Sequence, residues 1–291
     1  MKISSLQNLF HAQLSTLYQK REIDAIFYIY IHNKYNILKH HYYLNPDREI
    51  GFEDADLEML AKGYPIQYVT EETTFCELSF KVNPSVLIPR PETEELVAMI
   101  INKQKGIPIT LFSKSTLSSR KQKLLDIGTG SGAIAIALKK NIKNAEVWAT
   151  DVSEKALETA KINAKNCEVN ITFIQHDILK DDGVLLPDNL DIIVSNPPYI
   201  PLSERSNLHT NVVNCEPHEA LFVPDENPLI FYKAIAQTAK KLLKKGGVLY
   251  FETYEKFHSE LSVMLTEFDF KEITLGDDMN CKPRFISCKK L

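Results

Sequence analysis

The spacing of hydrophobic residues changes near position 72 of the chain. Before it, apolar side chains recur every three or four positions, which places them on one face of an amphipathic helix. Members of this series include Leu6, Phe10, Leu14, Ile23, Phe27 and Tyr30. We therefore predict a small helical domain over residues 1–72.

Residues 73–90 follow a period of two instead. Polar and apolar residues alternate over positions 73–75 and again over 78–82, and Asn83-Pro84 then turns the chain. Alternation of this kind is typical of strands with one buried face. We predict a β-hairpin that links the helical domain to the rest of the chain.

The remaining residues, 91–291, predict an α/β domain. A helix over 92–102 is followed by a Lys- and Ser-rich segment, 103–122, which we expect to be an exposed loop. Apolar runs predict strands at 123–127, 145–150, 171–175, 190–195, 247–252 and 283–290, and helical patterns lie at 131–141, 153–165, 227–244 and 255–268. This alternation predicts a mostly parallel, doubly wound sheet.

Composition narrows the class of protein. The hydrophobic fraction of 44% and the charged fraction of 25% are ordinary for a globular protein in water. The net charge of −4 is spread evenly and lacks the surplus of Lys and Arg that binds a nucleic-acid backbone. We therefore expect no stable nucleic-acid binding.

The five cysteines form no C-x-x-C pair, and histidines are not interleaved with them at metal-ligand spacing. We expect no metal site and no disulfide framework, and a reducing cytoplasmic setting. The longest early apolar run, 25–31, is too short to span a bilayer. No membrane association is expected.

The most specific chemical signal is Asn196, Pro197, Pro198 and Tyr199, directly after the apolar run 190–195. The Asn196 side-chain carbonyl can accept one N–H of a planar NH2 group, and the Pro197 backbone carbonyl, held by a stiff proline pair, can accept the other. Tyr199 offers an aromatic face for stacking. On these residues alone, a turn at a strand end remains the alternative.

A glycine-rich stretch joins the first predicted strand of the α/β domain to its helix. Gly128, Thr129, Gly130, Ser131 and Gly132 allow a sharp turn and the close approach of a ligand. The stretch also satisfies the dinucleotide pattern G-x-G-x-x-G/A. Alone it fits either a nicotinamide cofactor or S-adenosylmethionine (SAM).

Three residues at the ends of the next two strands are further cofactor candidates. Asp151 can accept hydrogen bonds from both ribose hydroxyls of either cofactor, or can instead cap the helix that begins near Ser153. Asp177 could accept from an adenine amino group, and Ile178 would pack on the adenine face. None of these residues separates the two cofactors.

The strand predicted over 190–195 separates the nicotinamide cofactor from SAM. Its carboxyl end, which carries Asn196, lies where doubly wound folds bind ligands. Hydride transfer has no need of two acceptors aimed at an NH2 group, whereas methyl transfer to nitrogen does. We therefore predict a SAM-dependent methyltransferase, with Asn196 beside the cofactor.

With these motifs the chain resembles the SAM-dependent N-methyltransferases. More closely, it is similar to the PrmC/HemK family, which methylates the glutamine of the Gly-Gly-Gln loop in peptide-chain release factors. The resemblance covers most of residues 60–291. Its most specific motifs, taken together, are Ile88-Pro89-Arg90-Pro91-Glu92-Thr93-Glu94 and Asn-Pro-Pro-Tyr at 196–199. Glu216-Pro217 is a further matching segment.

The resemblance implies a cytoplasmic protein-(glutamine-N5) methyltransferase with a Rossmann-like class I fold. It implies direct methyl transfer from SAM to the amide nitrogen, with no nucleophilic Ser or Cys. It also implies that the helical domain, 1–72, helps to grip the release factor.

Three alternatives stay open, one of which is an NAD-dependent dehydrogenase that would use the glycine-rich stretch. An adenine N6-methyltransferase acting on DNA or RNA would use the same Asn-Pro-Pro-Tyr pocket, since adenine also carries an NH2 group. A SAM-binding partner subunit without activity would be expected to lose Asn196 or a cofactor glycine, and both are present.

Overall fold

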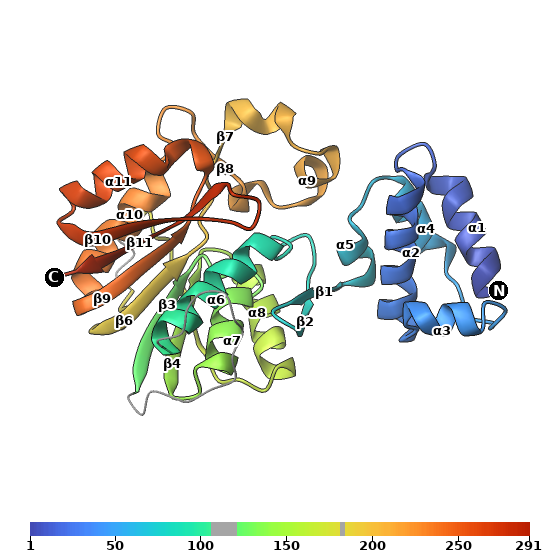
Figure 1. Cartoon of the computed structure of the whole chain (residues 1–291), viewed down its shortest axis with the longest axis horizontal. Helices are drawn as coiled ribbons and strands as arrows, with labels where there is room; N and C mark the ends of the chain where they lie inside the picture. The colour runs from blue at the N-terminus through green and yellow to red at the C-terminus, as the bar shows by residue number, and fades with distance from the viewer. Residues whose placement is uncertain (106–120, 181–183) are drawn as a thin grey trace. The chain divides into compact units, whose positions relative to one another are not determined.

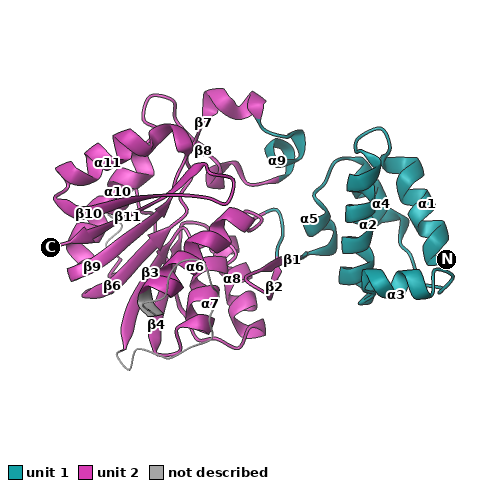
Figure 2. Cartoon of the chain, viewed as in Figure 1, with its two compact units in different colours: residues 1–72, 82–84, 208–215 teal, residues 73–81, 85–207, 216–291 magenta. Residues whose placement is uncertain are grey.

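The computed structural model describes residues 1–105, 121–180 and 184–291 and divides the chain into two compact units (Figure 1, Figure 2). The helical unit comprises Met1–Glu72, Val82–Pro84 and Leu208–Cys215. The sheet unit comprises Thr73–Lys81, Ser85–Asn207 and Glu216–Leu291.

The helical unit is built from short amphipathic helices: α1 (Ile3–Leu14), α2 (Lys20–Tyr35), α3 (Lys39–Leu44), α4 (Asp54–Ala61), α5 (Ile66–Thr70) and α9 (Thr210–Cys215). Its core combines aliphatic side chains with a group of aromatic rings. The Phe10 ring packs edge-on against Phe27 with centroids 5.5 Å apart and contacts Tyr30 at 5.2 Å. The spacing of three and four that predicted these helices reflects this buried stripe.

Helix α9 belongs to the helical unit although it lies far along the chain (Figure 2). The Asn211 side chain donates a hydrogen bond of 2.8 Å to the Tyr18 hydroxyl, and the Cys215 thiol lies 3.8 Å from the Gly63 carbonyl oxygen. The helical unit therefore takes in residues beyond the range 1–72 that periodicity indicated.

A two-stranded sheet of β1 (Glu72–Phe75) and β2 (Leu78–Lys81) stands where the hairpin was predicted. Its two turn residues, Cys76 and Glu77, have φ values of 49° and 62°. Two-residue hairpin loops need such left-handed backbone, which glycine or asparagine usually provides. The Phe75 and Phe80 rings, 5.9 Å apart and fully buried, stabilise the hairpin.

The sheet unit contains a seven-stranded sheet in the order β10-β11-β9-β6-β3-β4-β5. Its strands are β3 (Gln122–Ile127), β4 (Ala145–Asp151), β5 (Thr172–Gln175), β6 (Leu190–Ser195), β9 (Leu243–Glu252), β10 (Phe270–Asp277) and β11 (Pro283–Lys290). The pairs among β9, β6, β3, β4 and β5 are parallel, and β11 pairs antiparallel with β9 and β10. The prediction of a mostly parallel sheet is confirmed.

Helices cover both faces of this sheet (Figure 1). One face carries α6 (Pro91–Lys105), α7 (Ala133–Asn141) and α8 (Glu154–Asn166), and the other carries α10 (Ile230–Leu242) and α11 (His258–Glu267). The shorter elements are β7 (Ile200–Pro201), η1 (Leu202–Asn207), η2 (His218–Ala220), β8 (Phe222–Val223) and η3 (Glu255–Phe257).

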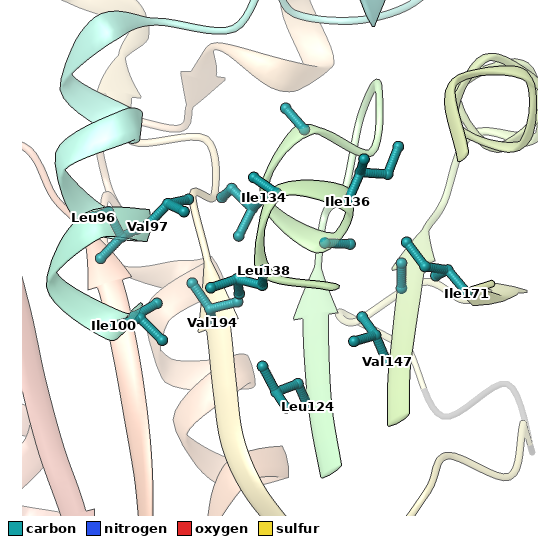
Figure 3. Close-up of a cluster of buried hydrophobic side chains, with 14 of the residues drawn as sticks. Leu96, Val97, Ile100, Leu124, Ile134, Ile136, Leu138, Val147, Ile171 and Val194 are labelled. Atoms are coloured by element: carbon teal, nitrogen blue, oxygen red, sulfur yellow. The ribbon is translucent and has the colours of Figure 1, made fainter. Parts of the chain in front are cut away.

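Successive strand residues enter opposite cores. Leu124 of β3 belongs to the buried cluster that holds Leu96 of α6 and Leu138 of α7 (Figure 3). Its neighbour Leu125 belongs to the cluster that holds Tyr232 of α10. Because both faces are buried, the strands read as continuous apolar runs rather than alternating ones.

Several predicted boundaries were wrong. Strand β10 was not predicted, because Phe270 is its only buried residue and no period of two marks it. Strand β9 begins at Leu243, which shortens the helix expected over 227–244, and the helix expected over 255–268 is η3 followed by α11. Of the predicted loop 103–122, residues 103–105 belong to α6 and residue 122 to β3, and 106–120 lie outside the described residues.

Within the described residues, no helix combines the length and the apolar character needed to cross a bilayer.

The side chain of Asn163 on α8 connects the hairpin to the glycine-rich loop. It is fully buried, accepts from the Lys81 N–H at 2.7 Å, and donates to the carbonyl oxygens of Lys81 and Ser131 at 2.9 Å each. All its hydrogen-bonding groups are thereby used, so its removal leaves the buried Ser131 carbonyl and the partly buried N–H and carbonyl of Lys81 without this partner.

We expect Asn163→Ala to lower the free energy of unfolding by about 2–4 kcal/mol, because each orphaned buried group carries a desolvation penalty. Urea denaturation measures this. Asn141→Ala is the matched control, since that exposed side chain bonds only to Ala137 in its own helix. Equal losses in the two variants would contradict the connecting role of Asn163.

Candidate functional site

The register of the parallel strands brings the predicted site residues to one edge of the sheet. Ile127 at the end of β3 lies opposite Thr150 of β4 and Ser195 of β6, and Ser195 lies opposite Phe251 of β9. The Ser195 hydroxyl donates to the Ile127 carbonyl at 2.7 Å, which ties two strand ends together. The residues that follow these strands therefore share one edge.

The glycine-rich loop folds back onto β4. The N–H groups of Gly128 and Thr129 both donate to the Thr150 carbonyl at 2.9 Å. Gly130 has a φ of 55°, and a Cβ built there would meet nothing within 4 Å. A left-handed backbone bordering open space lets a ligand approach the chain closely, as predicted for a cofactor loop.

Gly132 serves helix packing instead. Its φ is 83°, and a Cβ there would lie 3.1 Å from the Cβ of Ala160 on α8 and 3.0 Å from Ile136. This glycine therefore allows α7 to start tightly against α8, so the helix begins at Ala133 rather than at the predicted residue 131.

The side chains of Thr129 and Ser131 are buried rather than presented to a ligand. The Thr129 hydroxyl donates to Asp126 Oδ2 at 2.7 Å, and the Ser131 carbonyl accepts from Asn163. Both residues support the loop from inside the protein, and their contact with a cofactor stays a prediction.

Asp126 is a buried carboxyl that sequence reasoning did not single out. Its Oδ2 accepts from Thr129 and from the Ala135 N–H at 3.2 Å, while Oδ1 has no hydrogen-bond partner among the described residues. Burial raises the pKa of Asp126 to about 7, against the two hydrogen bonds, and the nearby charge of Asp151 adds to the rise.

Asp151, at the end of β4, holds the glycine-rich loop in place. Its Oδ2 accepts from the Gly130 N–H at 2.8 Å and its Oδ1 from the Ser153 N–H at 2.9 Å. Burial raises the pKa of Asp151, and these backbone bonds oppose the rise. The N-cap of α8 is Ser153, whose hydroxyl accepts from the Ala156 N–H at 3.2 Å, so the alternative capping role belongs to Ser153.

Asp177 and Ile178 follow β5, which is separated from β6 in the sheet by the two strands β3 and β4. Asp177 Oδ2 pairs with Lys180 at 2.8 Å and Oδ1 accepts from the Leu179 N–H at 3.0 Å, and the Lys180 hydrogen bond lowers the pKa of Asp177. Ile178 is half-buried against the core under α10. Their roles beside adenine stay predictions.

Asn196 directly follows β6, and its side chain has a defined orientation. Its Nδ2 donates to the Thr93 hydroxyl at 3.2 Å, so Oδ1 is the group left for another donor. Pro197 is buried and Pro198 is half-buried. The structure thus gives the predicted amide pocket one oriented acceptor.

Tyr199 is anchored at both its ring and its hydroxyl. The hydroxyl donates to Glu252 Oε1 at 3.2 Å, and the ring lies nearly parallel to Tyr254, with centroids 6.0 Å apart and planes 10° apart. One ring face is therefore used within the protein, and stacking of a substrate on Tyr199 stays a prediction.

The sequence assigned no role to three residues near Asn196 and Tyr199: Glu252, Arg284 and Thr93, the last of which lies in the motif 88–94. Glu252, 2% exposed, accepts from Thr93 at 2.6 Å and from Tyr199. Burial raises the pKa of the Glu252 carboxyl, while Thr93, the Arg284 charge and Tyr199 oppose the rise. A charged residue directly after the apolar run 248–251 was the available signal for Glu252.

A second buried carboxylate, that of Glu216, bonds to the segment 88–94 that contains Thr93. Glu216 accepts from the Ile88 N–H at 3.3 Å and pairs with the Arg90 guanidinium. This contact joins the two sequence motifs 88–94 and 216–217, which lie far apart in the chain.

The loop edge fits a cofactor with a ribose and a positive charge. Gly130 borders open space, and the Asp151 carboxylate retains acceptor positions beyond its bonds to Gly130 and Ser153 and carries a negative charge when ionised. SAM has both features. Within the described residues, no group of three or more His, Cys, Asp or Glu side chains is arranged to hold a metal ion.

Comparison with known proteins agrees with this geometry. The family profile for a methyltransferase domain matches residues 118–285. The chain is 41% identical to the release factor glutamine methyltransferase of Flavobacterium psychrophilum, over 98% of each chain. It is 40% identical to the protein of the same name from Bacteroides thetaiotaomicron, over 79% of this chain and 78% of the relative.

Solved structures share the fold. The 16S rRNA N2 G1207 methyltransferase of Thermus thermophilus, solved with AdoMet and guanosine, superposes with a TM-score of 0.52 at 17% identity, over 76% of this chain and 50% of that chain. A methyltransferase from Pyrococcus furiosus gives 0.50 at 18% identity, over 73% and 89%. The predicted Rossmann-like class I methyltransferase fold is confirmed.

The raised pKa of Asp126 predicts a pH dependence of stability. The unfolded chain releases this proton near the ordinary value of 3.8, whereas the folded protein holds it up to about pH 7. The contribution to stability is therefore complete below the unfolded pKa and is lost as the pH rises through about 7.

We expect Asp126→Asn to gain stability relative to the unsubstituted protein between pH 5 and pH 8, by a few kcal/mol, because it removes the cost of ionising a buried carboxyl. Denaturant unfolding across this range measures the difference. The exposed residue Asp269 gives the control Asp269→Asn. A difference that stays constant with pH would rule out Asp126 as the titrating group.

Proposed function

This chain belongs to the family of release factor glutamine methyltransferases, and on that premise we propose that Asn196 and the Pro197 carbonyl hold the amide nitrogen that is methylated. The enzyme is a SAM-dependent methyltransferase that acts on a release factor glutamine. We propose that this glutamine is the one in the Gly-Gly-Gln loop of peptide-chain release factors. The observation that carries the proposed role of Asn196 is the hydrogen bond from Asn196 Nδ2 to Thr93, which leaves Oδ1 to accept an N–H.

When bound, SAM supplies the methyl group. We propose that the loop from Gly128 to Gly132 and the Asp151 carboxylate hold it. The open space at Gly130 supports close backbone approach, and the acceptor capacity of Asp151 supports hydrogen bonding to ribose hydroxyls.

The chemistry asked of the protein is mainly positioning. An amide nitrogen is a weak nucleophile because its lone pair is delocalised, so the protein must align it and favour the positive charge that grows on it. Two fixed acceptors do both, and positioning of reactants can lower a barrier by roughly 7–11 kcal/mol. A nitrogen that has gained a methyl group is strongly acidic, so its proton can pass to water without a side-chain base.

Glutamine is favoured over adenine as the guest. The relatives that match most of the chain are named as release factor glutamine methyltransferases. The net charge of −4 also argues against a surface that binds a nucleic-acid backbone.

We further propose that the helical unit contributes to recognition of the release factor, in the cytoplasm. Its surface exposes large side chains at the end of α3, where Tyr43 is 62% and Leu44 81% exposed. Tyrosine side chains such as that of Tyr43 are enriched at protein–protein interfaces.

We expect Asn196→Ala to lower kcat on the order of 10²–10³, as for removal of one hydrogen-bond partner of a transition state. The assay follows methyl transfer from labelled SAM to a release factor, with a factor lacking the loop glutamine as the blank. Asn141→Ala controls for the substitution itself. Near-normal turnover of Asn196→Ala with SAM still bound would refute the amide pocket.

We expect Asp151→Ala to weaken SAM binding at least about tenfold, since a hydrogen bond to a charged group contributes roughly 1.5–3 kcal/mol. Isothermal titration calorimetry with SAM measures the dissociation constant. Asp269→Ala, at an exposed ion pair with Lys240, is the control. Unchanged affinity in Asp151→Ala would reject the ribose role.

A further inference from the structure

We propose that Thr93 and Glu252 act as positioning residues that determine which end of the Asn196 amide faces the substrate. This inference rests on the proposed role of Asn196 as an acceptor for the glutamine N–H. It adds to that role the reason why the side-chain oxygen, rather than the NH2 group, is the end presented.

The three side chains form one chain of hydrogen bonds. Asn196 Nδ2 lies 3.2 Å from Thr93 Oγ1, and Thr93 Oγ1 lies 2.6 Å from Glu252 Oε2. Thr93 is 5% and Glu252 2% exposed, so water does not compete for these groups. The chain runs from the end of β6 through the first turn of α6 to the end of β9.

The order of donors follows from the chemistry of the groups. An ionised carboxylate only accepts, so the single Thr93 proton is directed to Glu252. The Thr93 oxygen then faces Asn196 as an acceptor. Only the NH2 end of the Asn196 amide can satisfy it, and Oδ1 must point the other way.

Two hydroxyl donors and one positive charge stabilise the ionised form of Glu252 against burial, which raises the pKa of its carboxyl. Thr93 and Tyr199 each donate a hydroxyl to a different carboxylate oxygen, and Arg284 on β11 contributes a positive charge. Burial and the charge of Glu92 on α6 act against ionisation. Tyr232 of α10 donates to the backbone carbonyl of Glu252 and leaves the carboxylate oxygens free for the other two hydroxyls.

Reversal of the donor order among Glu252, Thr93 and Asn196 would change whether the pocket binds a hydrogen-bond donor or an acceptor. If Thr93 received a proton from position 252, it would donate to Asn196, and the amide would turn its NH2 group outward. An outward NH2 group faces the NH2 group of the substrate, and two donors cannot bond. The buried carboxylate thus selects guests that donate hydrogen bonds.

The test uses substitutions that alter the hydrogen bonds among Asn196, Thr93 and Glu252 while keeping the side chains close to their original size. Thr93→Val removes the hydroxyl, and we expect kcat to fall on the order of 10–10², as for a displaced positioning group. Thr93→Ser keeps a hydroxyl, and we expect turnover close to that of the unsubstituted enzyme. Glu252→Gln introduces an N–H donor into the chain, and we expect a fall similar to that in Thr93→Val.

Three readouts separate positioning from a merely structural role. The SAM dissociation constant and the melting temperature of Thr93→Ser and Glu252→Gln should stay near the unsubstituted values. The double variant Thr93→Val/Glu252→Gln should be no slower than the worse single variant, because the two residues act as one unit. Thr266→Val, which removes a helix-surface hydroxyl bonded to Ser262, is the control and should turn over normally.

Full turnover of Thr93→Val, or equal impairment of Thr93→Ser and Thr93→Val, would overturn the inference. Multiplicative losses in the double variant would do the same. Asn196→Ala distinguishes this failure from failure of the proposed function. If Asn196→Ala is inactive while Thr93→Val has normal turnover, the acceptor role of Asn196 is supported and the orienting role of Thr93 and Glu252 is refuted.

Discussion

A single buried carboxylate at the end of β9 organises the candidate amide pocket. Glu252 is 2% exposed, and a charge so placed must be satisfied by hydrogen bonds or by an opposite charge. Thr93 from α6 and Tyr199 from the loop after β6 donate to its two oxygens, and Arg284 from β11 adds a positive charge. Satisfying one side chain therefore brings three distant parts of the sequence together, and Asn196 is oriented as a consequence.

The candidate cofactor site, at the carboxyl ends of β3 and β4, depends on another carboxylate, that of Asp151. Carboxyl ends of neighbouring parallel strands meet at one edge of the sheet, and Asp151 uses that proximity to hold the Gly130 N–H. Asp126 lies beneath the loop, where burial raises its pKa and its Oδ1 is unpaired among the described residues. The candidate cofactor site thus places buried and partly buried carboxyl groups beneath a loop that borders open space at Gly130.

Much of this could be predicted from the sequence, because the decisive residues carry their own local signals. The predicted chemistry of the motifs 196–199 and 128–132 rests on backbone groups and on side chains within each motif. Four or five consecutive residues are therefore enough to recognise each of them. Thr93 and Glu252 could not be assigned, since their role exists only where β9 and α6 meet. The left-handed turn at Cys76 and Glu77, and the membership of α9 in the helical unit, likewise depend on tertiary contacts rather than propensity.

In this account the Thr93 hydroxyl donates its proton to Glu252, and Asn196 therefore presents its side-chain oxygen to the substrate. Neutron diffraction from deuterium-exchanged crystals observes this directly. We predict the Thr93 hydroxyl deuteron on the line to Glu252 Oε2, and an Asn196 Nδ2 deuteron directed at Thr93 Oγ1. A Thr93 deuteron directed at Asn196, with the amide oxygen facing Thr93, would contradict the account.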